Sequence, residues 1–230
     1  MRIRLAVALG AVSMLALSGC GSDLSPDLHP GAAAVVGDQT ISIEDVDARV
    51  GDYCELVLPQ LQQANTAEPL SSLRADYLSV LVEETLARQY ADAHDLDEEA
   101  QFRPQQAKIR DEVEQNIAAH LRGTARDYLT RSTYAATVET MVALDVAQKA
   151  GKQLASQDDA TTLGKQTIAQ WAHDNDLDVV LDPRFDPAGT DEQSLSFAVS
   201  DLAKGTQGKK PDDAKVKAYV ASLPDSQKCG

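Results

Sequence analysis

The apolar residues of this chain recur every three or four positions over most of its length. This spacing covers residues 43–61, 71–94, 97–121, 130–155 and 160–175, and it predicts a series of amphipathic helices. The apolar stripe over 71–94 is the most convincing, whereas 97–121 has a thin apolar edge and the charged face of a solvated helix surface. The pattern therefore predicts a mainly α-helical domain.

Two short β-type runs precede these helices. Residues 34–36 and 40–42 are joined by a Gly-Asp-Gln turn, and an isolated hairpin of this size is only marginally stable in water. The hairpin therefore needs a partner, and the brief apolar run at 179–181 has the composition of one. We expect a small β-sheet formed by the N-terminal hairpin (about 34–42) and a late strand (about 178–182).

Local signals predict where the first and last helices lie. Ser42 stands three residues before Asp45, an arrangement close to a capping box that should start a helix at Ile43. Pro59 should kink or end that helix, because proline lacks the N–H that a helix interior requires. A further helix is expected over 212–223, within a tail rich in Gly, Asp, Lys and Ser.

The N-terminus has the features of an export signal. Arg2 and Arg4 precede an apolar run over 5–17, which is shorter than the roughly 20 residues that a membrane helix needs. The run ends in a sequence that resembles the bacterial lipobox, formed by Leu17, Ser18, Gly19 and Cys20. The alternative is an ordinary secretory signal with an incidental cysteine.

The lipobox resemblance implies a processed and lipid-modified protein. Residues 1–19 would be a lipoprotein signal peptide, and Cys20 would carry a diacylglyceryl thioether and an N-acyl chain. Two or more chains matter, because a single acyl chain binds a bilayer only marginally. Residues 20–32 would form a flexible tether. We expect a protein anchored by lipid in the cell membrane, on its extracytoplasmic face.

Two further cysteines, Cys54 and Cys229, remain once Cys20 is lipidated. An even number of cysteines outside the cytoplasm indicates a disulfide. This one would close a loop of about 175 residues, for which the chain-entropy model gives an upper figure of roughly 5 kcal/mol. The alternative is two free thiols, with Cys229 at a frayed end.

The chain is strongly acidic, with 36 acidic and 21 basic residues and a net charge of −15. Loss of the signal peptide would remove Arg2 and Arg4 and make it more negative. A field of this sign repels nucleic acid and anionic lipid headgroups. We therefore expect no nucleic-acid partner, and contact with the membrane only through the lipid.

The sequence contains no recognisable catalytic or metal-binding pattern. No nucleophile elbow is present, and the four histidines (His29, His94, His120 and His173) are scattered through polar segments. Three aspartates at 174, 176 and 178 fit the first positions of a calcium loop, but Val179 and Phe185 occupy the positions that need Gly and Glu. We expect no catalytic residue, no metal and no cofactor, and hence no enzyme.

Three segments, taken in order, carry a resemblance to a known family. The first is the opening hairpin with the acidic start of its helix, carried by Val36, Gly37, Asp38, Ile41, Ser42, Glu44 and Asp45. The second is a helix end followed by acidic residues, carried by Ala91, Asp95, Leu96, Asp97, Glu98 and Glu99. The third is the closing strand, carried by Val179, Leu181, Pro183, Arg184 and Phe185. Together these segments resemble the N-terminal chaperone domain of the SurA and PrsA family of extracytoplasmic foldases. The departures from the family pattern are Ser42 for Thr, and Asp95 and Asp186 for Gly.

This resemblance covers about residues 33–186 and implies a helical chaperone domain without the parvulin-type prolyl isomerase. The implied function is that of an ATP-independent holdase whose partners are unfolded or newly exported polypeptides. Apolar residues such as Leu70, Val80 and Leu86 would either line a client groove or form plain helix core. The alternative function is a structural or adaptor cell-envelope lipoprotein that binds one folded partner. Residues 187–230 are expected to form a loosely packed C-terminal tail.

Overall fold

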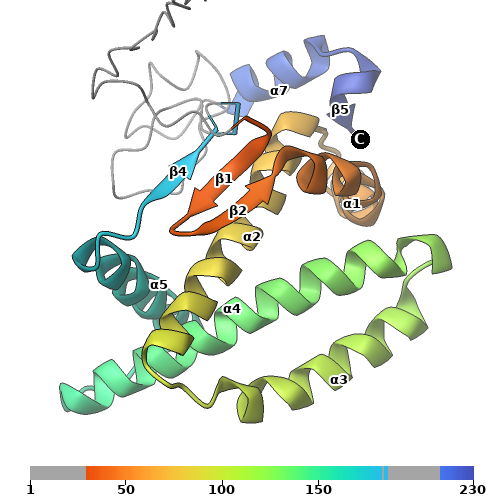
Figure 1. Ribbon diagram of the computed structural model, residues 1–230. Coiled ribbons are helices and arrows are strands. Elements are labelled where there is room, and N and C mark those ends of the chain that lie inside the picture. Colours follow the sequence, from red (N-terminus) through yellow and green to blue (C-terminus); the bar gives the residue numbers. More distant parts are fainter. Residues whose placement is uncertain (1–29, 183, 186–212) are drawn as a thin grey trace, which may run out of the picture. The chain divides into compact units, whose positions relative to one another are not determined.

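The structure is a computed structural model that describes residues 30–182, 184–185 and 213–230. It is mainly helical with a small antiparallel sheet, so the predicted fold class is confirmed. The signal peptide, the lipobox with Cys20, most of the tether and tail residues 187–212 lie outside the described residues. The helices are α1 (Ile43–Ala64), α2 (Leu70–Ala93), α3 (Glu98–Asn116), α4 (Arg122–Lys149), α5 (Gln157–Asp174) and α7 (Asp213–Ser222), with 3-10 turns at Ala119–Leu121 and Asp225–Gln227 (Figure 1).

The opening hairpin and the late strand form one three-stranded sheet. Its strands are β1 (Ala32–Val36), β2 (Gln39–Ser42) and β4 (Val179–Leu181), and β1 lies in the centre. The β1–β4 pair is antiparallel and places Val35 opposite Val180 and Val36 opposite Val179. The predicted pairing of two segments about 140 residues apart is therefore confirmed.

α2 packs against several of the other elements. It contacts α1, α4, α5 and β1, and its side chains Tyr77, Leu78 and Val82 are among the largest that are fully buried. Val80 and Leu86 are also buried in the core, and Leu70 packs against it, so these three side chains form helix core. Among the described residues, no helix combines the length and the apolar character needed to cross a bilayer.

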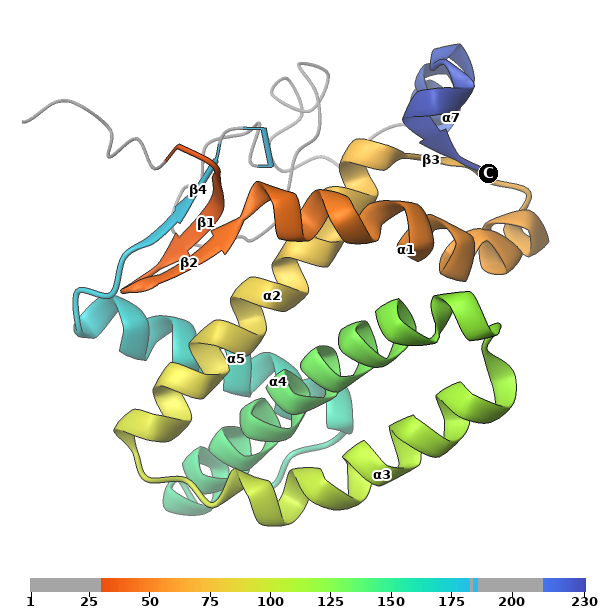
Figure 2. The same cartoon turned by 45° about the vertical axis from the view of Figure 1, so that its right-hand side comes forward.

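α3 lies on the side of α4 away from the sheet in both ribbon views (Figures 1 and 2). It contributes few side chains to the main core, chiefly Phe102, whose ring meets that of Tyr134 edge to face at 5.3 Å. A smaller apolar cluster forms farther along, where Ile109 and Val113 of α3 pack against Ala125 of α4. α3 is thus held to α4 near each end of the pair, as its thin apolar edge allows.

The start of α1 agrees with the sequence, and its end does not. The Ser42 hydroxyl accepts a hydrogen bond from the Asp45 N–H at 3.0 Å, which confirms the predicted cap. Pro59 does not end the helix, which continues to Ala64. Leu61 beyond the proline is buried, and Asn65 closes the helix in the left-handed conformation at φ 50°. Packing and this cap offset the one hydrogen bond that proline removes.

The last residues are packed more closely than the predicted loose tail. Cys54 of α1 and Cys229 are joined by a disulfide, with Cα atoms 5.7 Å apart. This bond lies beside a two-stranded ladder between β3 (Glu68–Pro69) and β5 (Lys228–Cys229). Val220 of α7 is also buried. The covalent link and the ladder fix a segment whose polar composition alone indicates loose packing.

Candidate functional site

A cavity of about 450 Å³ lies between the last turns of α4 and α5. The exposed surface of this α4–α5 cavity is mostly apolar, although Val146 and Trp171 are the only apolar residues among those that line it. Trp171 is the only tryptophan of the chain. The full lining is Val146, Gln166, Thr167, Gln170, Trp171, Asp174 and Asn175.

The position of Trp171 follows from how α5 packs on its neighbours. Gly164, Ile168 and Ala172 face inward and are buried. A Cβ on Gly164 would lie 2.0 Å from the backbone oxygen of Glu139, so α5 can approach α4 this closely only with glycine at that point. Trp171 precedes buried Ala172 and lies at the edge of the inward face, where it is half-buried.

An aromatic cluster supports Trp171 from the end of α2. The rings of Tyr90 and His94 are stacked with centroids 4.0 Å apart, and Tyr90 meets Trp171 edge to face at 5.2 Å. His94 lies 5.8 Å from Trp171. The indole is therefore held by rings on one side while it also borders the cavity. Edge-to-face pairs of this kind contribute roughly 0.5–1.5 kcal/mol beyond the area that they bury.

Polar groups around the cavity are three side-chain amides, one carboxylate and the Thr167 hydroxyl, which donates to the Leu163 carbonyl at 2.8 Å. The Gln170 amide donates to Asp174 Oδ1 at 2.7 Å, and the Asn175 amide donates to the Trp171 carbonyl at 2.8 Å. Each of these amides also has an oxygen that accepts hydrogen bonds, and Gln166 adds a third amide. Hydrogen-bond donors and acceptors are therefore both present beside an apolar surface.

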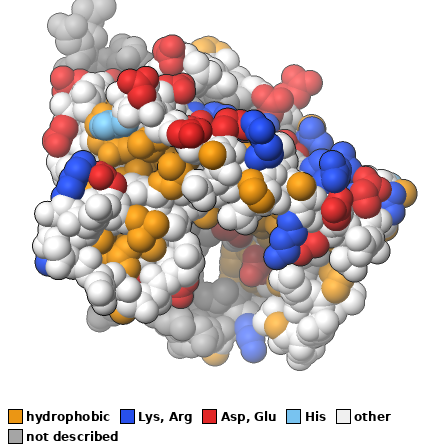
Figure 3. All heavy atoms as spheres, turned by 90° about the horizontal axis from the view of Figure 1, so that it is seen from below, with side chains coloured by type: hydrophobic (Ala, Val, Ile, Leu, Met, Phe, Trp, Pro, Cys, Tyr) orange, Lys and Arg blue, Asp and Glu red, His pale blue; other side chains and the backbone are white. Residues whose placement is uncertain are grey.

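On the face of the described residues drawn in Figure 3, the apolar side chains do not form one continuous strip. Seen from below, they gather in several separate areas, with carboxylates and basic groups between them (Figure 3). Among the described residues, the large apolar side chains that are most exposed also lie on different elements: Leu129 and Leu144 on α4, Val180 on β4 and Tyr219 on α7.

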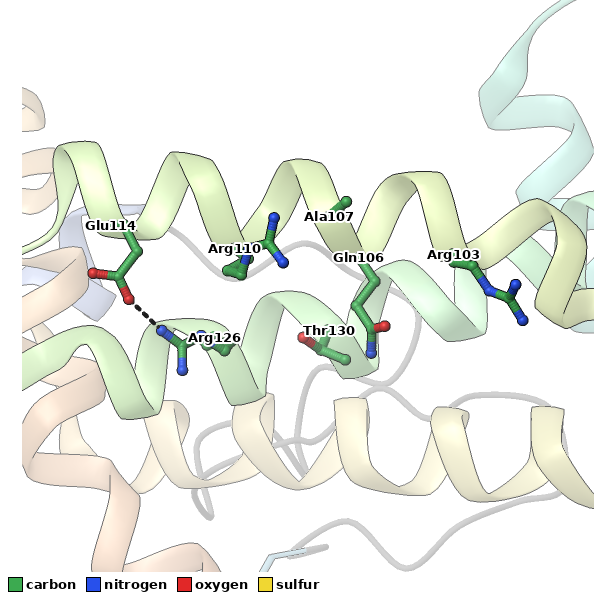
Figure 4. A pocket seen from close by; sticks show the side chains of 7 residues that line it. All are labelled: Arg103, Gln106, Ala107, Arg110, Glu114, Arg126 and Thr130. Carbon is green, nitrogen blue, oxygen red and sulfur yellow. Dashed lines mark hydrogen bonds and ion pairs between the residues drawn. The ribbon is translucent and has the colours of Figure 1, made fainter.

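A second cavity, of about 550 Å³, separates α3 from α4 (Figure 4). Its lining is polar and rich in arginine, and its only carboxylate is that of Glu114. The gap exists because the side chains between Phe102 and Ile109 of α3 are all exposed, so no apolar contact draws the helices together there. The full lining is Arg103, Gln106, Ala107, Arg110, Glu114, Arg126 and Thr130.

A buried acid, Glu84, and its ion pairs serve the packing of α2 against α4. Glu84 of α2 is 5% exposed and forms ion pairs with Arg88 at 2.7 Å and with Arg131 of α4 at 2.5 Å. Arg131 in turn contacts Asp127 at 2.9 Å, and Asp127 accepts the Tyr77 hydroxyl hydrogen at 2.5 Å. Burial is the main cause that raises the pKa of Tyr77. None of these residues lines either cavity.

Glu139 is a second buried acid, on the inward face of α4. Its side chain is 3% exposed, and burial raises its pKa from 4.5 to about 7. Glu83 of α2 raises the pKa further, whereas Lys165 of α5 lowers it. Lys165 itself is paired with Glu83 at 2.7 Å. Glu139 therefore lies where three helices meet, next to the close approach at Gly164.

The described histidines lie in three different settings. His94 stacks on Tyr90, and His120 contacts Glu55 at 2.9 Å. His173 lies 3.5 Å from Asp174. Within the described part of the chain, no group of three His, Cys, Asp or Glu side chains is placed to hold a metal ion.

The lipobox residues Leu17, Ser18 and Gly19 and the acceptor Cys20 lie outside the described residues, so their role stays a prediction. The apolar spacing over 160–175 includes Trp171, but it does not indicate the cavity beside this residue. The arginines of α3 belong to the charged face that the sequence over 97–121 predicts to be solvated. No family model, curated protein or solved structure matches the chain.

Proposed function

We propose that the protein is a lipid-anchored, extracytoplasmic holdase that binds extended segments of unfolded or newly exported polypeptides without ATP and without prolyl isomerase activity. The lipobox motif supports the location, and the three ordered motifs support the chaperone class. The observation that carries the proposal is the α4–α5 cavity, in which an indole ring lies among amide side chains.

The chemistry of this cavity suits a polypeptide of variable sequence. Every peptide unit of an extended chain presents an N–H donor and a C=O acceptor, and the amides of Gln166, Gln170 and Asn175 can pair with both. Trp171 and Val146 offer an apolar surface to side chains that alternate along the strand. A cavity of about 450 Å³ can contact only a short segment of a client. A contact this small gives weak and rapidly exchanging binding, as a holdase requires.

The single tryptophan makes the proposal directly testable. Titrating the protein with a reduced, unfolded client should change the intensity and emission maximum of Trp171 fluorescence, because the indole borders the cavity that the client enters. In parallel, stoichiometric protein should slow the light-scattering increase of an aggregating client. Absence of both effects would refute the proposal.

A pair of variants distinguishes client binding in the cavity from nonspecific binding to other exposed apolar side chains. Trp171→Ala should lose most of the aggregation suppression, whereas Leu144→Ala should keep it, since Leu144 is 55% exposed on α4 but does not line the cavity. Because Trp171 also packs on Tyr90, urea unfolding of both variants must show that they remain folded. Gln166→Ala, an exposed cavity residue, provides a second and milder variant.

The second candidate function is an adaptor that binds one folded envelope partner. The separate apolar areas of Figure 3 favour it, because a holdase for long clients profits from a continuous surface. Co-purification with one partner, without any effect on denatured proteins, would select the adaptor.

A further inference from the structure

We propose that the arginine-lined cavity between α3 and α4 binds an acidic peptide segment through the carboxylates of two Asp or Glu residues. It lies on helices other than α5 and shares no residue with the α4–α5 cavity. The proposal goes beyond holdase activity, because it assigns a preference for acidic sequence to a separate surface.

The cavity is positive in a protein that is otherwise strongly acidic. Three of its lining residues are arginines, Arg103 and Arg110 from α3 and Arg126 from α4 (Figure 4). The Gln106 amide and the Thr130 hydroxyl add hydrogen-bond donors. The net charge of −15 on the chain does not cancel this local field, because charges more than about 8 Å away are largely screened at physiological ionic strength.

The one carboxylate in the lining is already neutralised. Glu114 contacts Arg126 at 2.6 Å, drawn as a dashed line in Figure 4, and Arg122 at 2.9 Å. These contacts leave the guanidinium groups of Arg103 and Arg110 as the cations that a ligand would meet. Arg126 then closes one end of the cavity with Glu114.

The two α3 arginines are held only by exposed pairs on their own helix. Arg110 contacts Asp111 at 3.0 Å, with side chains about 60% exposed, and Arg103 reaches Glu99 only at 3.8 Å. Exposed pairs of this kind contribute about 0–1 kcal/mol. An incoming carboxylate that accepts two parallel N–H bonds from a guanidinium replaces them at little cost.

The spacing of these arginines selects the form of the ligand. Seven residues along α3 separate Arg103 from Arg110, which corresponds to about 10 Å at the helical rise of 1.5 Å per residue. A peptide in the polyproline II conformation, common in unfolded chains, has three residues per turn and advances about 3.1 Å per residue, so side chains three residues apart lie on one face about 9 Å apart. Acidic side chains three residues apart therefore match the two guanidinium groups.

The test compares two labelled peptides by fluorescence polarisation with the full mature protein. One carries Glu residues three positions apart in a Gly/Ser background, and the other carries Gln at the same positions. We expect the acidic peptide to bind at least about tenfold more tightly, with an affinity that falls as salt is added. Equal binding of the two peptides would overturn the proposal.

Charge-removing variants locate the contact. The double variant R103Q/R110Q should lose at least about tenfold in affinity for the acidic peptide. Lys108→Gln is the matched control, because it removes a cation from the same helix outside the lining, where Lys108 faces Glu112 at 3.7 Å. An equal loss in the control would show that only the general charge matters and would refute the site.

The same variants distinguish this proposal from the holdase proposal. R103Q/R110Q should still suppress client aggregation, since both residues lie outside the α4–α5 cavity. Failure of acidic-peptide binding with retained aggregation suppression would refute only the arginine-lined site. Acidic-peptide binding without aggregation suppression would refute only the holdase proposal.

Discussion

Glu139 should make the stability of this protein fall as the pH rises from about 4.5 to about 7. Burial raises the pKa of this carboxyl from 4.5 to about 7 in the folded state. Below about pH 4.5 the group is protonated in both states and contributes no difference. Above about pH 7 the folded protein must hold a buried carboxylate that the unfolded chain exposes to water.

The size of the effect follows from the shift in pKa. At 1.36 kcal/mol per unit, a shift from 4.5 to about 7 corresponds to a penalty of about 3 kcal/mol, developed between those two pH values. The native state binds more protons than the unfolded state in this window, so the sign is a loss of stability with rising pH. The charges that face Glu139 are Glu83 of α2 and Lys165 of α5.

Glu139→Gln removes the titrating group and keeps the shape of the side chain. Urea unfolding of both proteins at pH 4, 6 and 8 gives the free energy of unfolding at each pH. The free energy of unfolding of the variant, minus that of the wild type, should increase by up to about 3 kcal/mol from pH 4 to pH 8. At each pH, subtracting the wild-type value removes the effect of other groups that titrate in both proteins. Comparing this difference between pH values then removes any constant effect of the amide on stability.

The matched control is Glu112→Gln, at an exposed site on α3 where Lys108 is 3.7 Å away. This substitution should change the free energy of unfolding by no more than about 0.5 kcal/mol at each pH. A difference between Glu139→Gln and wild type that stays constant from pH 4 to 8 would refute the assignment of the buried acid.

The remaining predictions concern the two points where the helices are most tightly held. Replacing both Cys54 and Cys229 by Ser should lower the free energy of unfolding by up to about 5 kcal/mol, because the bond closes a loop with a sequence separation of 175; an unchanged urea midpoint with and without reductant would contradict this. Gly164→Ala should destabilise by about 3 kcal/mol, since its Cβ would lie 2.0 Å from the Glu139 backbone oxygen. Gly123→Ala in α4, where a Cβ meets nothing within 4 Å, should instead be neutral or stabilising, and an equal loss in both variants would refute the steric argument.

Features that depend on local chemistry were predictable from the sequence. Ser42 predicts the start of α1, because its side chain needs only the N–H of Asp45. Asp95 stands where the resembled family has Gly and adopts the left-handed conformation at φ 50°, as a short polar side chain permits. The pairing of β4 with β1 followed from a hairpin that could not be stable alone.

Features that depend on tertiary contact were not predictable in the same way. α4 begins at Arg122, eight residues before the apolar spacing indicates, because small or polar residues such as Thr124 and Ala125 fill the buried face there. Thr124 donates to Asp52 of α1 at 2.8 Å, a partner that no periodicity reveals. The spacing of large apolar side chains therefore does not predict a helical segment whose buried face is formed by small side chains.

The two cavities show the same limit for the candidate sites. Trp171 lies at the edge of a helix stripe, and only the course of α4 determines whether such an indole is covered or borders a cavity. Arg103 and Arg110 belong to a face that sequence alone assigns to solvent, and Arg126 joins them from another helix. A cavity arises from where two helices separate, which residue spacing on either helix does not encode.

The central position of β1 has a consequence for how the chain matures. One edge of β1 is covered at once by β2, but the other waits for β4, about 140 residues later. A chain that emerges N-terminus first therefore presents an open strand edge, a template for pairing with other chains, during most of its synthesis and export. β4 covers this edge of β1 and ends the interval, so a chain truncated before residue 179, which keeps α1 to α5 but lacks α7, should self-associate.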